Sequence, residues 1–470
     1  MTRAARQHDE NSLLRPALRR VAIGTLAACV ALGSLPARAQ VGGPLIRDAE
    51  IEQLLREYSQ HVLRSAGLAG QNVRIVLINN RAFNAFVVDG RRIFMNAGAL
   101  MDAETPNEVI GVIAHEAGHI AGGHLARMRE QMASASTAAL LAMLLGAGAM
   151  VAGGSSGGVG QAGAAILQAP QSIIQRSLLS YQRAHEEQAD RAAVKFLAAT
   201  GQSPKGMSDT FKRLGGQVMF NSRFIDPYLQ SHPMPRERIA ALEGLAKASP
   251  HWDRKDPPAL QQRHELMRAK IVGFIESRES VLRRYPAGNT SLPARYAHAI
   301  VAYRFGNPAA ALNQIDSLIA AQPGNAYFHE LKGQALLEAG RPAEAVAPLR
   351  RAVQLAPNPA LIQIMLGQAM VASNNPRLLD EAVRLLTAAR LREPETPEVY
   401  TQLAMAYGRR GNLPDADLAS AQAAAYRGDI KTAQQLAARA KSRFPVGSPG
   451  WVKADDITSY KPTDQEKRRK

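Results

Sequence analysis

The pentapeptide His115-Glu116-Ala117-Gly118-His119 constrains the fold of this chain more than any other feature of its sequence. It matches the pattern H-E-x-x-H, and residues four apart share one face of an α-helix, so both imidazoles can bind one metal ion. Residues 109–114 are apolar or glycine, which predicts a buried helix. The pentapeptide therefore requires a helix that presents two histidines to the inside of a folded domain.

The residue types of the pentapeptide also indicate which metal and which chemistry to expect. Two neutral ring nitrogens suit Zn²⁺, which takes three protein ligands in a catalytic site and leaves a fourth position for water. Glu116 follows the first histidine, where its carboxylate can reach that water and act as a general base. We therefore expect a hydrolase with one Zn²⁺ per subunit, His115 and His119 as ligands and Glu116 as the catalytic residue.

The third zinc ligand must come from outside the pentapeptide, and His124 is the nearest candidate. It follows His119 by five residues, whereas the metzincin pattern needs a histidine six residues on. We therefore expect His124 to lie beside the site or at the end of the helix.

Glu186 is the better candidate for the third ligand. It lies about 70 residues after the pentapeptide, in a segment 186–191 with a helical pattern, so Glu186 and Asp190 share one face. Glu186 can bind zinc while Asp190 accepts a hydrogen bond from a ligand histidine and fixes its ring. The neighbouring Glu187 fits less well, because Ala189 and Asp190 set the register in favour of Glu186. A charged helix face exposed to solvent is the simpler alternative for such a segment.

The N-terminus has the pattern of an export signal. A basic stretch is followed by an apolar run over residues 21–35, and Ala37-Arg38-Ala39 has the small-x-small form that precedes cleavage. We expect residues 1–39 to be a signal peptide and the chain to act in the periplasm of a Gram-negative bacterium. The alternative is a lipobox, Leu26-Ala27-Ala28-Cys29, which would anchor the chain to a membrane by a lipid.

Cysteine content and charge limit the function classes further. Cys29 is the only cysteine, so a chain cleaved after Ala39 has no disulfide, no catalytic thiol and no cysteine-bound zinc. The formal net charge is +17, from 57 basic and 40 acidic residues, which favours acidic partners. No nucleic-acid motif is visible and only 5% of the residues are aromatic, so we expect an anionic membrane surface and no nucleic acid.

The residues before the pentapeptide predict a helix and a small sheet. Residues 48–65 have a helical period, 73–78 have the composition of a strand, and the turn Asp89-Gly90 separates two further strand segments. Thr105-Pro106 predicts the start of a helix. The free edge of such a sheet can pair with an extended substrate.

Residues 138–169 form an unusual apolar segment with a glycine-rich centre at 153–158. One interpretation is a buried helical hairpin with a flexible tip. The other is a lid or a peripheral membrane contact, since glycine permits hinge motion. The first apolar run, 138–152, holds about 15 residues, fewer than the ~20 needed to span a bilayer.

The last third of the chain repeats with a period of 34 residues. Small residues in one helix and a proline near the end of the next are typical of tetratricopeptide repeats. Stacked helix pairs of this kind form a concave surface that binds peptides or partner proteins. The spacing of 34 recurs in three pairs of residues: Gly306 and Gly340, Pro323 and Pro357, and Gly333 and Gly367.

These patterns predict an α+β chain: a mostly helical zincin metalloprotease domain with a small β-sheet, followed by an all-α tetratricopeptide-repeat solenoid. We expect the protease domain at 45–250, a linker or helical connection at 251–290, repeats at 291–445 and a basic tail at 446–470.

The order of the motifs resembles that of the Ste/HtpX-type gluzincin peptidases. The pentapeptide is followed by Glu-Glu-Gln-Ala-Asp-Arg at 186–191 and then by His232-Pro233 with Arg238-Ile239. The export signal and the repeats make the chain most similar to periplasmic members that enhance β-barrel assembly. The resemblance spans roughly residues 45–440.

The resemblance implies roles for individual residues of this chain. It implies zinc ligands at His115, His119 and Glu186 with Glu116 as general base. It places His232 near the zinc, either occupying the open position in a latent state or stabilising the oxyanion, with Arg238 bracing the site.

The function expected from the motifs and the resemblance is a periplasmic zinc endopeptidase that is also a chaperone. Its partners would be unfolded or misassembled outer-membrane proteins and, through the repeats, the outer-membrane β-barrel assembly machinery. Two alternatives remain: a chaperone or scaffold whose repeats dominate and whose zinc site is latent, and a membrane-embedded protease that uses 138–169 as paired spans.

Overall fold

The computed structural model of the chain describes residues 44–131, 133, 182–220, 228 and 231–461. The expected signal peptide with Cys29, the apolar segment 138–169 and the last residues of the basic tail lie outside the described residues. Within the described part, no helix is both long enough and apolar enough to cross a membrane.

A four-stranded sheet lies near the start of the described chain, in the order β1-β2-β4-β3. The expected turn at Asp89-Gly90 joins β3 and β4 into an antiparallel hairpin, and β4 pairs in parallel with β2. The short strand β1, which no sequence pattern indicated, pairs antiparallel with β2. The strands are β1 (Leu45–Ile46), β2 (Arg74–Ile78), β3 (Ala85–Asp89) and β4 (Arg92–Asn96).

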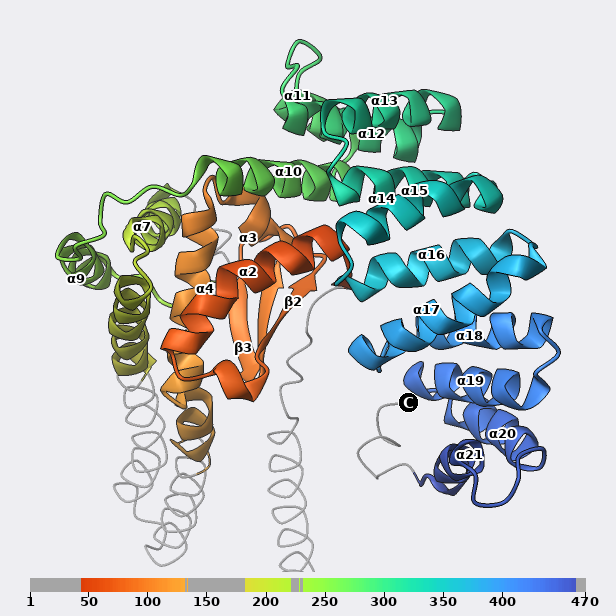
Figure 1. The fold of residues 1–470 in the computed structure, drawn as a ribbon. Coiled ribbons are helices and arrows are strands. Elements are labelled where there is room, and N and C mark those ends of the chain that lie inside the picture. The colour runs from red at the N-terminus through yellow and green to blue at the C-terminus, as the bar shows by residue number, and fades with distance from the viewer. Residues whose placement is uncertain (1–43, 132, 134–181, 221–227, 229–230, 462–470) are drawn as a thin grey trace, which may run out of the picture. The chain divides into compact units, whose positions relative to one another are not determined.

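Helix α2 (Ala49–Ser65) and helix α4 (Pro106–Ala121) pack against each other and against the sheet (Figure 1). Each helix begins at a side-chain cap, because Asp48 accepts from the amide of Ile51 and Thr105 accepts from the amide of Glu108. Pro106 occupies the first turn of α4, where a missing amide proton costs no helical bond. Two short helical elements complete this region: η2 (Ala69–Gln71) precedes β2, and α3 (Ala97–Asp102) lies between β4 and α4.

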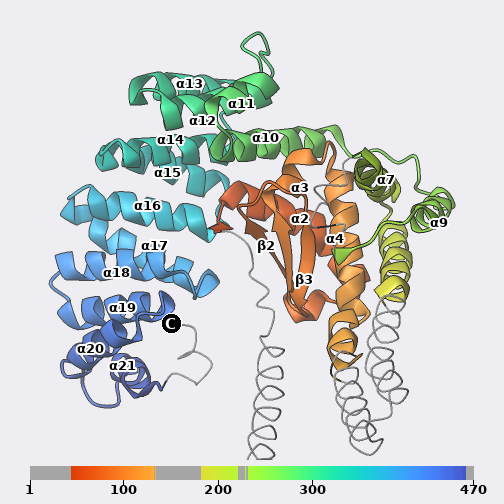
Figure 2. The same cartoon turned by 180° about the vertical axis from the view of Figure 1, so that it is seen from behind.

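Three more helices cover the other side of α4, as the reverse view shows (Figure 2). Residues 182–199 are helical, α7 (Lys205–Phe220) packs on α4, and α9 (Arg236–Lys247) packs on α7. Buried side chains of these helices form part of the core. Ile113, Leu197 and Phe211 are among them.

The expected linker or helical connection at 251–290 contains α10 (Pro258–Ile275) and α11 (Arg278–Arg284). Helix α10 belongs to two cores at once: Met267 lies in the core of the peptidase part, and Leu266 lies in a core formed with the first repeat helices. The helix therefore joins the two parts by burial rather than as a solvated spacer.

A buried ion network also joins the two parts. Nζ of Lys270 on α10 lies 2.8 Å from Asp48, 3.3 Å from Glu50 and 3.6 Å from Glu330, so helices α2, α10 and α14 meet at one cation. Tyr296 donates to Glu50 over 3.0 Å. A buried cation with three carboxylates is costly to separate, because each charge would be left unpaired.

The repeats follow as antiparallel helix pairs, each packed on the next. Gly333 and Gly367 explain the 34-residue spacing, because a Cβ at either position would collide with Leu349 or Leu386 of the following helix. A 3-10 turn, η3 (Pro376–Leu378), lies between α16 and α17. The helices are α12 (Leu292–Phe305), α13 (Pro308–Ala321), α14 (Ala326–Glu338), α15 (Pro342–Leu355), α16 (Ala360–Ala372), α17 (Leu379–Arg392), α18 (Pro397–Arg409), α19 (Leu413–Tyr426) and α20 (Ile430–Lys441).

The expected basic tail at 446–470 needs a correction. Residues 449–459 form helix α21 (Pro449–Ser459), which packs on α20 with Ala454 buried. Lys441 of α20 forms an ion pair with Asp455 over 2.5 Å. The charges at the end of the chain suggested a solvated tail, whereas the short apolar pattern before them forms a helix.

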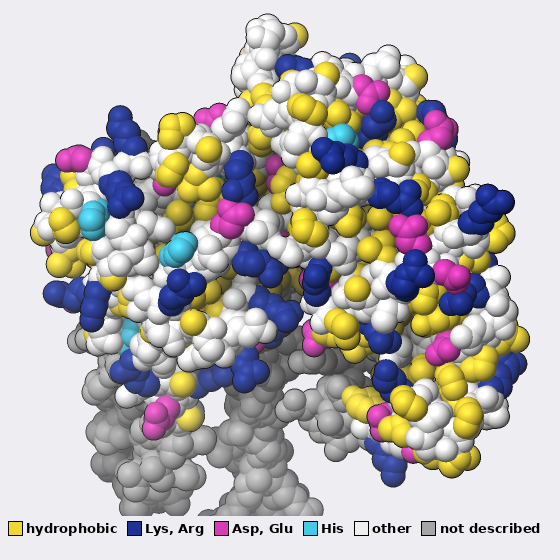
Figure 3. Space-filling model, in the orientation of Figure 1, with side chains coloured by type: hydrophobic (Ala, Val, Ile, Leu, Met, Phe, Trp, Pro, Cys, Tyr) yellow, Lys and Arg dark blue, Asp and Glu magenta, His cyan; other side chains and the backbone are white. Residues whose placement is uncertain are grey.

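The α+β architecture with helical repeats is the one expected from the sequence. Figure 3 shows one face of the molecule, on which Lys and Arg side chains are spread over both the peptidase part and the repeats and outnumber the acidic side chains. The net positive charge of the chain is therefore not confined to one domain.

Candidate metal centre

Helix α4 places the two histidines of the pentapeptide on one face. The side chains of His115 and Glu116 are buried, and that of His119 is 13% exposed. The Nε2 atoms of His115 and His119 lie 3.1 Å apart, facing the same point. Two ring nitrogens directed at each other in a buried place need a proton or a cation between them.

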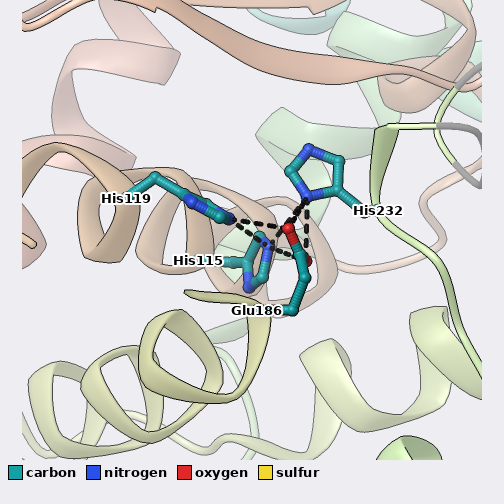
Figure 4. A group of neighbouring side chains, drawn as sticks. All are labelled: His115, His119, Glu186 and His232. Atoms are coloured by element: carbon teal, nitrogen blue, oxygen red, sulfur yellow. Dashed lines mark hydrogen bonds and ion pairs between the residues drawn. The ribbon is translucent and has the colours of Figure 1, made fainter. Parts of the chain in front are cut away.

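The helix at 182–199 adds the carboxylate of Glu186 to this face (Figure 4). Its oxygens lie 3.4 Å from Nε2 of His115 and 3.4 Å from Nε2 of His119. Gly118 permits this approach, because a Cβ there would lie 2.9 Å from the backbone oxygen of Ala189. Glycine in the fourth position of the pentapeptide thus lets the second helix pack closely enough for Glu186 to reach the histidines.

The distances among these donors fit a tetrahedral metal ion. Bonds of ~2.0–2.1 Å in a tetrahedral zinc site place neighbouring ligand atoms ~3.3 Å apart. The two Nε2 atoms lie 3.1 Å apart, that of His115 lies 3.4 Å from Oε2 of Glu186, and that of His119 lies 3.4 Å from Oε1 of the same carboxylate. Two imidazoles and one carboxylate are also the donor types that zinc takes in catalytic sites. The residues present therefore fit a metal of this kind.

His232 supplies a fourth donor atom. Its Nδ1 lies 3.3 Å from Nε2 of His115 and 3.0 Å from each oxygen of Glu186, and all four donor atoms lie within 4.8 Å of one another. The other ring nitrogen, Nε2, lies 3.6 Å from Oε1 of Glu116. His232 therefore lies between the cluster and the carboxylate expected to act as general base.

Arg238 and Asp190 support the cluster from behind. Arg238 binds Asp190 with two nitrogens, at 2.7 and 2.9 Å, and a third nitrogen lies 2.8 Å from Glu186. Asp190 in turn lies 3.0 Å from Nδ1 of His115. Burial acts to raise the pKa of Asp190, but hydrogen bonds from Arg238 and His115 outweigh it, so the pKa is lowered and the carboxylate stays ionised.

Glu116 has a different environment from the other carboxylates. Its side chain is 1% exposed, and neither oxygen accepts a hydrogen bond from the described residues. Burial raises the pKa of Glu116 above its usual value, although the nearby His232 and His115 act in the opposite direction. A buried carboxylate with free acceptor positions and a raised pKa is suited to exchange a proton with a bound water.

The two other candidates for the third ligand, Glu187 and His124, are not part of the cluster. Glu187 is exposed, on the other face of its helix. His124 lies beside the cluster but is not part of it: its Nδ1 lies 3.0 Å from Nδ1 of His119, and its Nε2 lies 3.2 Å from Oε1 of Gln188. A neutral His119 that directs Nε2 at the cluster can therefore donate from Nδ1 to His124, which donates in turn to Gln188.

Sequence reasoning missed the residues that surround the cluster. Tyr228 stacks on His232 with ring centroids 4.6 Å apart, Phe211 packs edge-on against His115, and His185 stacks on His124. Tyr228 and Phe211 come from segments with no motif, so nothing in their spacing pointed to the site. His185 and Gln188 lie next to Glu186 in the sequence, and a helical wheel of that segment could have suggested them.

Comparison with known proteins finds a peptidase domain followed by helical repeats. Residues 47–246 match the model of peptidase family M48, and residues 296–359 and 336–400 match tetratricopeptide repeats. A β-barrel assembly-enhancing protease of Yersinia pestis is 26% identical over 418 residues, which cover 87% of this chain and 83% of that protein. Its counterpart in Escherichia coli K12 is 26% identical, over 86% of this chain and 82% of that protein.

A third relative matches a shorter stretch of the chain. The metalloprotease LoiP of Escherichia coli K12 is 28% identical over 199 residues, covering 41% of this chain and 72% of that protein. The two β-barrel assembly-enhancing proteases align with both the peptidase part and the repeats of this chain. The match to LoiP covers less than half of the chain. Residues 47–246 are therefore a peptidase domain of family M48, followed by tetratricopeptide repeats, and the chain is a metalloprotease.

Proposed function

We propose that this chain is a zinc-dependent endopeptidase of the Gram-negative periplasm that degrades misfolded outer-membrane proteins and assists β-barrel assembly. The observation that carries the proposal is the cluster of His115, His119 and Glu186, whose donor atoms are spaced for one tetrahedral ion. The long relatives named as β-barrel assembly-enhancing proteases support the biological setting. The export pattern of residues 1–39 supports the compartment.

The residues of the centre have separate tasks in the proposed hydrolysis. His115, His119 and Glu186 would hold one Zn²⁺, which when bound lowers the pKa of water toward ~7 and polarises the scissile carbonyl. Glu116 takes the proton of the attacking water and passes it to the leaving amine. Its buried oxygens accept no hydrogen bond from the described residues, so they are available to that water.

His232 is proposed to cap the open position of the centre in a latent state. The support is its Nδ1 atom, which is spaced from His115 and Glu186 like a fourth ligand. Stabilisation of the oxyanion is the alternative, and it requires the ring to turn away from Glu186 when a substrate binds. Arg238 braces the centre in both cases, through Asp190 and Glu186.

The substrate is proposed to bind as an extended chain along β3. This strand lies at an edge of the four-stranded sheet and packs against α4, the helix of the pentapeptide. An edge strand offers unpaired amides and carbonyls to an extended peptide. Unfolded or misassembled outer-membrane proteins fit this mode because they lack the pairing that would satisfy their own backbone.

The remaining partners are proposed from the repeats and the leader. The repeats would contact the β-barrel assembly machinery, and residues 138–169 would touch the membrane peripherally. A lipid anchor at Cys29 is the alternative form of attachment. Release of the protein from membranes by carbonate or high salt supports peripheral contact, whereas a requirement for detergent supports an anchor or embedded spans.

The experiment that tests the proposed activity pairs metal analysis with cleavage. Purified protein is assayed for zinc and for cleavage of an unfolded outer-membrane protein, with Glu116→Gln beside the wild type. We expect equal zinc content and loss of cleavage in the variant, because glutamine cannot accept the proton. Full activity of Glu116→Gln would disprove the role of Glu116.

A chaperone or scaffold with a latent zinc site is the second candidate function. The peptide-binding surface of stacked repeats favours it, and it is compatible with a protease in the same chain. If cells with only Glu116→Gln assemble outer-membrane proteins normally, the repeats carry the main function. If assembly fails as in cells without the protein, the peptidase activity is required.

A further inference from the structure

A cavity of about 600 Å³ is lined by residues of α11, α12 and α13, at the start of the repeats. Its volume is within the ~300–1,000 Å³ typical of ligand pockets. None of its lining residues belongs to the metal centre.

Part of the lining is apolar and open to solvent. Val301 and Ala302 of α12 contribute to it, together with Leu282 and Phe305. Leu282 is 38% exposed and Phe305 is 44% exposed, which places two large apolar side chains at the rim of one cavity. Apolar side chains gathered at a concave place indicate a ligand with an apolar group.

The charge of the lining has one sign. Arg278, Arg295 and His298 are its ionisable residues, and no carboxylate lines the cavity. Arg295 donates to the backbone oxygen and the hydroxyl of Ser317, at 2.7 and 2.8 Å, which hold its guanidinium in place without neutralising it. Neither arginine forms an ion pair with any residue in the described part of the chain. The cavity therefore has positive charge beside apolar surface, although Glu279, outside the lining, interacts with the charge of Arg278.

Helix α13 adds groups that suit a peptide backbone. Asn313 and Gln314 line the cavity with exposed side-chain amides, which can both donate and accept. Neither amide forms a hydrogen bond within the described residues. The hydrocarbon chain of a lipid could not use these groups, whereas a peptide backbone could.

We propose that this cavity binds the C-terminal residue and the preceding backbone of a polypeptide. A C-terminal residue has a carboxylate and a side chain on the same carbon, so one apolar residue can satisfy both the guanidinium of Arg295 and the surface at Phe305. The amides of Asn313 and Gln314 bind the preceding backbone. An internal Asp or Glu fits less well, because its side chain supplies the carboxylate and the same residue then has no apolar side chain.

The test measures binding of a fluorescent pentapeptide that ends in phenylalanine to the full chain. Its two forms have a free carboxylate or a C-terminal amide. We expect the amide to bind at least tenfold more weakly, because it cannot form charge-assisted hydrogen bonds with a guanidinium. Equal affinity of the two forms would overturn the proposal.

Protein variants locate the binding in this cavity. Arg295→Gln is expected to lower affinity for the free acid at least tenfold and to leave affinity for the amide unchanged. Arg351→Gln, on the exposed face of α15, is the matched control and should bind like the wild type. If Arg295→Gln unfolds, Arg278→Gln replaces it, since Arg278 forms no hydrogen bond or ion pair with the described residues. Unchanged affinity in a folded variant contradicts the proposal.

A last measurement separates a peptide from a lipid. Dodecanoate offers a carboxylate and an apolar chain but no amides. If dodecanoate binds through Arg295 and the pentapeptide does not, the cavity is a fatty-acid site and the proposal is wrong. Binding of the pentapeptide that depends on Arg295 supports it.

Discussion

Oδ1 of Asp190 lies 3.0 Å from Nδ1 of His115, on the opposite side of the imidazole from the Nε2 atom that faces His119 and Glu186. A carboxylate in this place keeps the proton on Nδ1 and leaves the lone pair of Nε2 for a metal. Arg238 binds the same carboxylate through two nitrogens. The contact thus connects α9, the helix at 182–199 and α4 into one support for the metal centre.

Asp190→Asn is expected to weaken metal binding about 10- to 100-fold, because the amide does not hold the histidine in the required tautomer as strongly. The loss is measured by competition for zinc with a chelator of known affinity. Asp209→Asn, at an exposed position on α7, serves as the control and should bind zinc like the wild type. Unaltered affinity in Asp190→Asn would show that the contact with His115 has no role in metal binding.

Glu186→Ala is expected to lower the zinc content, because it removes the only carboxylate among the four donors and leaves the three histidines His115, His119 and His232. Glu187→Ala should retain it, since Glu187 is exposed on the other face of the helix. Metal content of both variants is measured by elemental analysis after dialysis. A Glu186→Ala protein with full zinc content would return His124 and Glu187 to consideration.

His232→Ala is expected to raise cleavage of a short peptide several-fold if the ring caps the open position at rest, because the cap competes with the substrate. Zinc content should remain near one per chain, since His115, His119 and Glu186 are unchanged. The measurement compares kcat and KM of the variant with those of the wild type. Loss of kcat at unchanged zinc content would instead assign His232 to the oxyanion.

Glu330→Gln is expected to change how stability depends on pH. Burial raises the pKa of Glu330 to about 7, although Lys270 acts in the opposite direction. The folded chain therefore binds more protons than the unfolded chain, whose glutamate has a pKa of ~4.3, and stability is lost as pH rises from ~4.3 to about 7. Below that window the effect of the residue on stability is absent.

The variant removes this dependence, because glutamine has a similar shape and no charge. We expect the free energy of unfolding of Glu330→Gln, relative to that of the wild type, to rise by ~1–3 kcal/mol from pH 5 to pH 8. Urea unfolding at both pH values measures the gain, with Glu395→Gln at an exposed position as control. Equal differences at pH 5 and pH 8 would show that Glu330 does not titrate in this window.

Features with a short period could be predicted from the sequence alone. The helix of the pentapeptide, the hairpin at Asp89-Gly90 and the 34-residue repeat each depend on neighbours a few residues apart or on a regular interval. The hydrophobic period, turn residues and helix caps act between residues that are close in the sequence. They can therefore be recognised in the sequence without knowledge of the fold. The assignment of an α+β peptidase followed by helical repeats, and the class of enzyme, followed from these features.

The selection among donors was decided by tertiary structure. The position of Glu186 opposite the two histidines depends on how closely the helix at 182–199 packs at Gly118. His232 lies between Glu186 and Glu116 although both are distant from it in the sequence. Packing of this kind joins residues that no local pattern relates.

The same distinction applies to two helices whose packing no local pattern predicted. The expected linker or helical connection at 251–290 contains α10, which is buried in two cores, and α21 forms where a tail was expected. The ion network of Lys270 with Asp48, Glu50 and Glu330 joins residues more than 200 positions apart. The sequence determined the elements and the chemistry available to them, because these depend on local spacing. Only the tertiary structure decided which side chains meet, because burial and close packing depend on the whole chain.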